Sequence, residues 1–108
     1  MAIITTGDHT NIPVTLKKNG KTFTISSGAV IKAVITNTAR NAVISPEVII
    51  DNNATGTDLA NSLIVVEFNE TESSAITQLN DAMLEIQVAD PEKKTWTTPI
   101  LIRQGNIA

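Results

Sequence analysis

Apolar and polar residues alternate along several short stretches of this chain, and a period of two is typical of β-strands that bury one face. The longest such stretch spans 81–103, where Leu84, Ile86 and Val88 are separated by polar residues. The segment Asp90–Lys94 interrupts the alternation with an aspartate and a proline, which both favour a turn. The stretch therefore predicts a β-hairpin. Its returning arm places these residues on one side: Trp96, Ile100 and Ile102.

Further strands follow from the same alternation, at a spacing of roughly ten residues that is typical of all-β sandwiches. We predict strands over the ranges 3–6, 10–17, 29–38, 42–50 and 62–68, and a further strand that contains Phe23 and Ile25. The last of these ranges has apolar residues on both faces, which is typical of a central strand.

The dipeptide Asn19-Gly20 separates two of these predicted strands. It is a strong hairpin signal, because a type I′ turn requires a positive φ at both central residues. We therefore expect the strand before the dipeptide to pair with the strand after it. The inward residues of the second strand are then Phe23 and Ile25.

Two prolines lie inside predicted strands. Pro13 falls within 10–17 and Pro46 within 42–50. Because proline has no amide hydrogen to donate to a neighbouring strand, it is confined to edge strands and bulges. Both prolines therefore predict sheet edges, where exposed backbone groups can accept a strand from a partner.

One short helix is predicted over about 70–78. Asn69 can accept a hydrogen bond from the first turn, and Glu72 lies three residues later, which is the pattern of a capping box. We expect this helix to cover one open end of the core. Its predicted apolar side consists of Ala75, Ile76 and Leu79.

Six to eight strands with one helix favour an all-β fold, an antiparallel two-sheet immunoglobulin-like β-sandwich. The Cys…Trp…Cys signature of true immunoglobulins is absent. A chain of 108 residues is expected to form a single domain, 1–108. The expected core comprises Ile12, Val14, Leu16, Phe23, Ile25, Ile31, Ile35, Ile64, Val66, Leu84, Ile86, Val88 and Ile100.

Composition and charge exclude several classes of function. The formal net charge is −3 and the lysines gather at predicted turns, so we expect no nucleic-acid partner. The absence of cysteine excludes disulfides and thiolate metal sites. The first residues lack the features of a secretory signal, and no apolar run approaches the ~20 residues of a membrane span. We therefore expect synthesis in the cytoplasm and no membrane partner.

The candidate metal-binding and catalytic residues lack the partners that such sites need. His9 stands beside Asp8 in a predicted turn, and we interpret it as a solvated residue. The stretch 51–58 offers oxygen ligands for calcium, with Asp51 and Asp58 at its ends, but it does not have the spacing of an EF-hand loop. We interpret it as a polar loop and leave calcium binding open.

The remaining candidate chemistry also has simpler explanations. Four glutamates could supply a glycosidase pair, yet solvated faces and the helix dipole explain them as well. They are Glu67, Glu70, Glu72 and Glu85. Trp96 is either a sugar-stacking platform or a residue at the rim of the core. We predict no catalytic residue, no metal and no cofactor, since no nucleophile or nucleotide motif is present.

Several short motifs follow one another over almost the whole chain: Gly7-Asp8, Ile12–Leu16, Asn19–Lys21, Gly28–Ala33, Ile64–Phe68, Leu84–Pro91, Pro99–Leu101 and Gly105–Ile107. In this order they resemble the N-terminal domain of phage baseplate upper proteins. The resemblance implies a non-enzymatic β-sandwich that docks a receptor-binding apparatus onto the tail of a tailed phage.

From the resemblance and the predicted edges we expect a structural protein of the tailed-phage virion, made in the cytoplasm of the bacterial host. It is expected to form homo-oligomers and to contact other virion proteins of the tail, the baseplate or the capsid. The predicted interaction surfaces are the edges at Pro13 and Pro46, the two termini and Trp96. Capsid decoration is a first alternative, a glycan-binding or adhesion module that uses Trp96 is a second, and a small hydrolase is a third.

Overall fold

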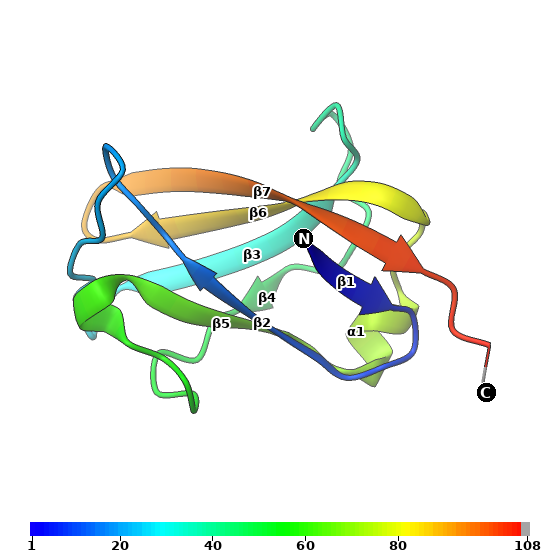
Figure 1. Ribbon diagram of the computed structural model, residues 1–108, viewed down its shortest axis with the longest axis horizontal. Helices are drawn as coiled ribbons and strands as arrows, with labels where there is room; N and C mark the ends of the chain where they lie inside the picture. Colours follow the sequence, from blue (N-terminus) through cyan, green and yellow to red (C-terminus); the bar gives the residue numbers. More distant parts are fainter. Residues whose placement is uncertain (107–108) are drawn as a thin grey trace.

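Two β-sheets pack face to face in the computed structural model, which describes residues 1–106 (Figure 1). The larger sheet has five strands in the order β1-β7-β6-β3-β4, and the smaller sheet pairs β2 with β5. The elements are β1 (Ala2–Thr5), β2 (Thr10–Thr15), β3 (Val30–Thr36), β4 (Val48–Ile49), the 3₁₀ turn η1 (Leu59–Asn61), β5 (Leu63–Phe68), α1 (Glu70–Ser74), β6 (Asn80–Ala89) and β7 (Lys93–Arg103).

The strand order is that of an immunoglobulin-like sandwich, in which a sheet of strands G, F and C packs against a sheet that contains B and E. Here β7, β6 and β3 take the places of G, F and C, while β2 and β5 take those of B and E. The predicted fold class, an all-β two-sheet sandwich of the immunoglobulin-like kind, is therefore confirmed. One pair departs from the antiparallel pattern, because β1 runs parallel to β7.

The hydrophobic core lies between the two sheets. In β5 the alternate residues Ile64, Val66 and Phe68 are fully buried. Burial of each large apolar side chain stabilises the folded state by about 1.5–3 kcal/mol. Every residue expected in the core is buried except Val14 and Phe23, which are partly buried and pack against it.

The hairpin predicted over 81–103 is confirmed as β6 and β7, which pair antiparallel along their length. Ile100 and Ile102 are buried and Trp96 is partly buried on the same side of β7, as predicted. β3 pairs antiparallel with the other side of β6 and lies within the strand predicted over 29–38. These three strands form the middle of the larger sheet.

The turn at Asn19-Gly20 forms as predicted, with φ of 53° and 76° at the two residues, and their neighbours exchange backbone hydrogen bonds. The strand pairing predicted across it is wrong. Residues 22–29 form no strand, and β2 pairs antiparallel with β5 instead. That pairing places Ile12 opposite Val66, so the apolar faces of both strands are buried together.

The expectation that 62–68 forms a central strand is also wrong. Among the described residues the only strand that pairs with β5 is β2, and an isolated bridge joins Leu63 to Asp58, so both strands of the smaller sheet are edge strands. Leu63 and Val65, on the second face of β5, are only partly buried. This difference in width between the sheets leaves one side of the sandwich open.

The helix predicted over 70–78 is shorter and ends at Ser74. The chain then extends, because the Thr77 amide donates a hydrogen bond to the Ile44 carbonyl at 2.9 Å. Ile76 is buried as predicted. The other residues predicted for the apolar side are exposed, namely Ala75 and Leu79. No helix within residues 1–106 has the length and apolar character needed to cross a membrane.

Of the strand predicted over 42–50, only the two residues of β4, Val48–Ile49, form a strand. The Ser45 hydroxyl accepts a hydrogen bond from the Ile35 amide of β3 at 2.8 Å, so a side chain replaces the backbone partner at this point. Pro46 follows directly and cannot donate to the ladder. The proline therefore marks an interrupted edge strand, as its position in the sequence predicts.

Burial predicts very different effects for one substitution at two isoleucines. Ile64 is fully buried and Ile49 is 72% exposed. We expect Ile64→Ala to lower the free energy of unfolding by about 2–5 kcal/mol, because it opens a cavity in the core. We expect Ile49→Ala to change it by less than about 0.5 kcal/mol. Urea unfolding of both variants measures the difference, and similar losses would contradict this assignment of the core.

Candidate functional site

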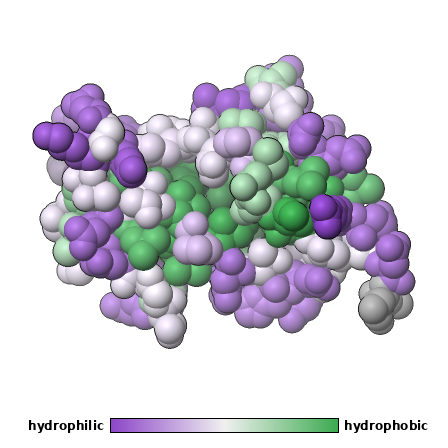
Figure 2. Space-filling view, viewed as in Figure 1, coloured by the Kyte–Doolittle hydropathy of each residue, from purple (hydrophilic) through white to green (hydrophobic). Residues whose placement is uncertain are grey.

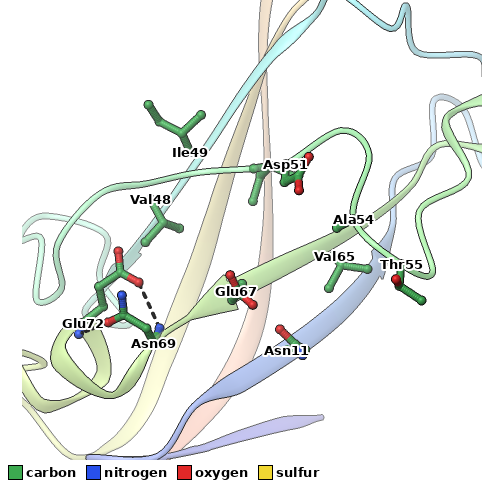
Figure 3. A pocket seen from close by; sticks show the side chains of 11 residues that line it. Asn11, Val48, Ile49, Asp51, Ala54, Thr55, Val65, Glu67, Asn69 and Glu72 are labelled. Atoms are coloured by element: carbon green, nitrogen blue, oxygen red, sulfur yellow. Dashed lines mark hydrogen bonds between the residues drawn. The ribbon is translucent and has the colours of Figure 1, made fainter.

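A groove of about 480 Å³ follows the open side of the sandwich, where the edges of β4 and β5 face each other (Figure 3). Val48 and Asp51 line one wall, and Val65 and Glu67 of β5 line the other. The loop at residues 54–55 closes one end. The start of α1 closes the opposite end. The groove therefore runs along β5, at the position of strand D in immunoglobulin-like sheets of the order ABED.

The register of the smaller sheet decides which backbone groups of β5 face this groove. The Leu16 amide donates to the Ser62 carbonyl at 2.9 Å, which makes this a hydrogen-bonded pair. Because such pairs alternate along an antiparallel ladder, Pro13 and Val65 form a non-hydrogen-bonded pair. The amides and carbonyls of Val65 and Glu67 thus point away from β2. Within residues 1–106 these backbone groups have no hydrogen-bond partner.

The facing edge of β4 is open in the same way. The Ile50 amide donates to the Ile31 carbonyl of β3 at 2.8 Å, so the backbone of Ile49 points away from β3. Ile49 is one of the lining residues, but its exposed side chain points away from β5, on the opposite side of β4 from Val48 (Figure 3). Two unpaired strand edges therefore border the same groove.

The groove is acidic. Asp51, Glu67 and Glu72 line it, and among the described residues no lysine or arginine does. Two of these carboxylates have local roles, since Asp51 accepts from the Asn53 amide at 2.9 Å and Glu72 caps the helix. Their charges still face the groove, so it favours cations over anions.

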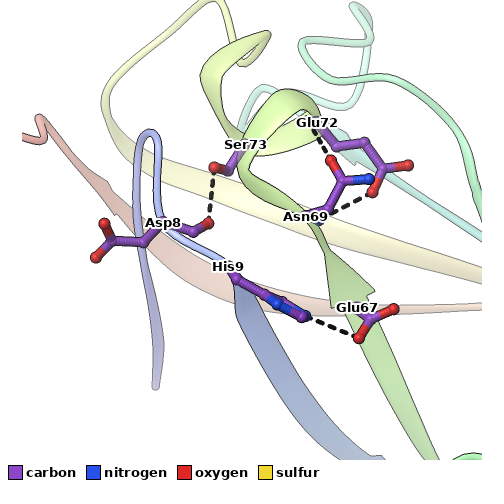
Figure 4. A network of polar contacts seen from close by, with 6 residues as sticks. All are labelled: Asp8, His9, Glu67, Asn69, Glu72 and Ser73. Carbon is purple, nitrogen blue, oxygen red and sulfur yellow. Dashed lines mark hydrogen bonds and ion pairs between the residues drawn. The ribbon is translucent and has the colours of Figure 1, made fainter. Parts of the chain in front are cut away.

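A network of polar contacts fixes the helical end of the groove (Figure 4). The Asn69 side chain accepts from the Glu72 amide at 2.8 Å, and the Glu72 carboxylate accepts from the Asn69 amide at 2.9 Å. This is the predicted capping box. The buried hydroxyl of Ser73 donates to the Asp8 carbonyl at 2.8 Å and accepts from the Gly7 amide at 3.0 Å. α1 is therefore tied to the turn between β1 and β2.

The structure separates most of the candidate catalytic residues. His9 Nε2 lies 2.8 Å from Glu67 Oε2. The histidine is exposed, but it has a carboxylate partner that the sequence did not predict. Asp58 accepts from the Asn61 side chain, and Glu85 pairs with Arg40 at 2.6 Å. Glu70 lies in the first turn of α1. Within residues 1–106 no three acidic, histidine or cysteine side chains gather in a way that could hold a metal ion.

Trp96 lies in an aromatic cluster beside a pocket of about 250 Å³. Its ring stacks on Phe23 with 5.6 Å between the ring centres, and its indole N–H donates to the Lys17 carbonyl at 3.0 Å. The Lys18 ammonium lies 4.5 Å from the centre of the Phe23 ring. The cluster thus attaches the 17–23 segment to β7, and it occupies one face of the indole.

Pro13 and the N-terminus, predicted as separate interaction surfaces, lie together. Met1, Ala2, Pro13 and Pro99 line a second groove of about 440 Å³ between the two sheets. Figure 2 shows hydrophobic residues gathered across the middle of this face of the molecule. Pro46 is not part of either groove and is half-buried. The C-terminal end includes residues 107–108, which are outside the described part of the chain.

The acidic groove beside β5 is the feature that sequence reasoning missed. Its one signal is the pair of apolar residues, Leu63 and Val65, on the outward face of a strand. In the sequence alone, that signal predicts a central strand. The polar stretch 51–58 also occupies the place in the chain where a further strand would follow β4.

No protein-family model and no curated protein matches the chain. One solved structure with a similar fold is a candidate glycoside hydrolase from Bacteroides vulgatus, with a TM-score of 0.54 and 6% identity over 98% of this chain. The chain spans 17% of that protein's length. Another is a VGSC β subunit studied for multimeric cell-adhesive interactions, with a TM-score of 0.45, 12% identity, and coverage of 97% of this chain and 90% of that one. At these identities the first likeness shows the fold alone.

The capping box should contribute measurably to stability. We expect Asn69→Ala to lower the free energy of unfolding by about 1 kcal/mol, because the Glu72 amide loses its acceptor. Asn11→Ala is the matched control, since Asn11 is exposed on β2, and we expect a change below about 0.5 kcal/mol. Chemical denaturation measures both, and equal effects would show that the cap is not a stabilising contact.

Asp90 links stability to pH. The Ser26 amide donates to its carboxylate at 2.9 Å, and hydrogen bonding by Ser26 holds the pKa of Asp90 below its ordinary value of 3.8. Ionised Asp90 therefore stabilises the fold above pH 3.8, and this contribution disappears as the pH falls through the lowered pKa. We expect the stability difference between the wild type and Asp90→Asn to vanish at low pH. Unfolding curves from pH 2 to 6 test this, and a difference that does not vary with pH would refute it.

Proposed function

We propose that this protein is a non-enzymatic structural component of a tailed-phage virion. It is a small β-sandwich that assembles through its edge strands and N-terminal region. Its partners are other virion proteins, on the tail or baseplate or on the surface of the capsid. This proposal includes capsid decoration as one form of the same role.

The observation that carries the proposal is the unequal width of the two sheets. A two-stranded sheet covers a five-stranded one, so both of its strands are edges. Natural proteins usually blunt or cover such edges, because unpaired backbone groups accept strands from other chains. Here large apolar side chains are exposed near the edges, notably Met1, Ile3 and Ile49. Unpaired edges with exposed apolar residues beside them favour a protein that functions by binding other proteins.

The distribution of ionisable groups supports a role without catalysis. His9 and Glu67 form one exposed pair, and Arg40 and Glu85 form another elsewhere on the surface. The lowered pKa of Asp90 is caused by a structural hydrogen bond from Ser26. Active sites typically concentrate several ionisable groups in one cleft. The arrangement found here favours binding over reaction chemistry.

The test is the composition of the virion. We expect the protein to be present in purified particles of the phage that encodes it, at a fixed ratio to the major capsid protein, as measured by quantitative mass spectrometry. Purified protein should also bind isolated tails or capsids with a saturable stoichiometry in sedimentation assays. Absence from the particles together with monomeric behaviour would contradict the proposal. Saturable glycan binding that Trp96→Ala abolishes would instead favour an adhesion module.

A further inference from the structure

We propose that the groove beside β5 binds an extended segment of a partner protein as an additional β-strand, and that this segment carries lysine or arginine. The added strand would occupy the position of strand D in the smaller sheet. The proposal rests on the proposed function in one respect: the partner is a virion protein. The site itself is argued from the groove alone.

Among the edges of the two sheets, β5 is the one best able to accept a strand. β1 has four residues and β4 has two, so each offers few ladder groups. β2 has six residues, but Pro13 removes a donor from the middle of its free edge. Directly opposite Pro13, Val65 keeps its amide, and the free edge of β5 continues to Glu67. In the smaller sheet, a proline therefore interrupts the free edge of β2, whereas the free edge of β5 has no proline.

The groove has the shape and surface for a short strand. The bridge between Asp58 and Leu63, with two hydrogen bonds of 2.9 Å, already uses the start of the β5 edge. The remaining edge from Val65 to Phe68, where β5 ends, accommodates about four residues of an added strand, or about 13 Å. Val48 faces the core and offers apolar surface to the inward face of such a strand, whereas Val65 and Glu67 border its outward face. Main-chain pairing then supplies affinity, and the alternate side chains supply specificity.

The charge of the groove selects a basic segment. Asp51, Glu67 and Glu72 line it without a lysine or arginine among the described residues, and His9 is the one basic partner of Glu67. A lysine or arginine on the added strand would meet these carboxylates, whereas an acidic segment would be repelled. Complementary charge also accelerates the encounter of the two partners.

A second copy of this chain is a poor occupant, on the part of the chain that the structure describes. Its neighbouring lysines lie in two places. The group at 17–21 includes a tight turn whose ends bond each other, and Lys93 and Lys94 belong to β7, where they pair with β6. Neither place offers a free extended segment. The other basic residues do not offer one either, because Lys32 and Arg103 lie in paired strands and Arg40 forms an ion pair with Glu85. The occupant is therefore assigned to a different protein.

The direct test uses an eight-residue peptide, capped at both ends, in which valine and lysine alternate. We expect saturable binding in isothermal titration calorimetry. Hydrogen exchange followed by NMR should show slower exchange of the Val65 and Glu67 amides on binding, because both become ladder donors. The matched peptide of alternating valine and glutamate should bind at least ten-fold more weakly.

Two substitutions in β5 test whether the peptide binds in the groove. Val65→Pro removes an amide that points away from β2, so the β2–β5 ladder keeps its hydrogen bonds, and we expect affinity to fall at least ten-fold. Glu67→Lys reverses a charge at the edge and should have a similar effect. Glu92→Lys makes the same charge change at the exposed turn outside this groove and should leave affinity unchanged. Thermal melts verify that each variant is folded.

Several results would overturn the proposal. These are the absence of peptide binding, binding that leaves the two amides exchanging freely, and equal weakening by Glu67→Lys and Glu92→Lys. Protection of the two amides in the protein alone, with self-association in ultracentrifugation, would assign the groove to a second copy. The proposed function fails separately: peptide binding in a protein that is absent from virions would retain the site and reject the virion role.

Discussion

The packing of two sheets of unequal width is the constraint on which the rest of this structure depends. Each strand alternates apolar and polar side chains, so each sheet has one face that must be removed from water. Two strands in the smaller sheet bury their apolar faces against the middle of five strands in the larger one. This packing completes the core, but it leaves both edges of the smaller sheet without a neighbouring strand. The open edges of the molecule are a direct result.

Those edges carry backbone groups that a folded protein normally satisfies. Water can satisfy them in the isolated chain, but a partner strand does so while also covering apolar side chains. The two edges of the smaller sheet differ, because β2 contains a proline and β5 does not. α1 and the 51–58 loop then define the ends of the exposed β5 edge. The unequal width of the sheets thus creates the groove beside β5, and the 51–58 loop and α1 set its length.

Local signals predicted local structure well, because their causes lie within a few residues. The β6–β7 hairpin, the Asn19-Gly20 turn and the capping box at Asn69 all depend on neighbours in sequence. The partner of β2 depends on which distant strand can share its buried face, and Asn19-Gly20 carries no information about that choice. The groove was harder still to predict. Its open amides follow from the register of β2 on β5, which the alternation of side chains does not specify.

The parallel pairing of β1 with β7 has a mechanical consequence. Ala2 lies opposite Ile100 and Thr5 opposite Arg103, so the two strands point the same way. Tension applied between the start of β1 and the end of β7 would slide these strands past each other. Their hydrogen bonds would then bear the load together, where a hairpin pulled from its open end would lose its bonds one after another. This arrangement resists stretching along the direction in which its two outer strands run.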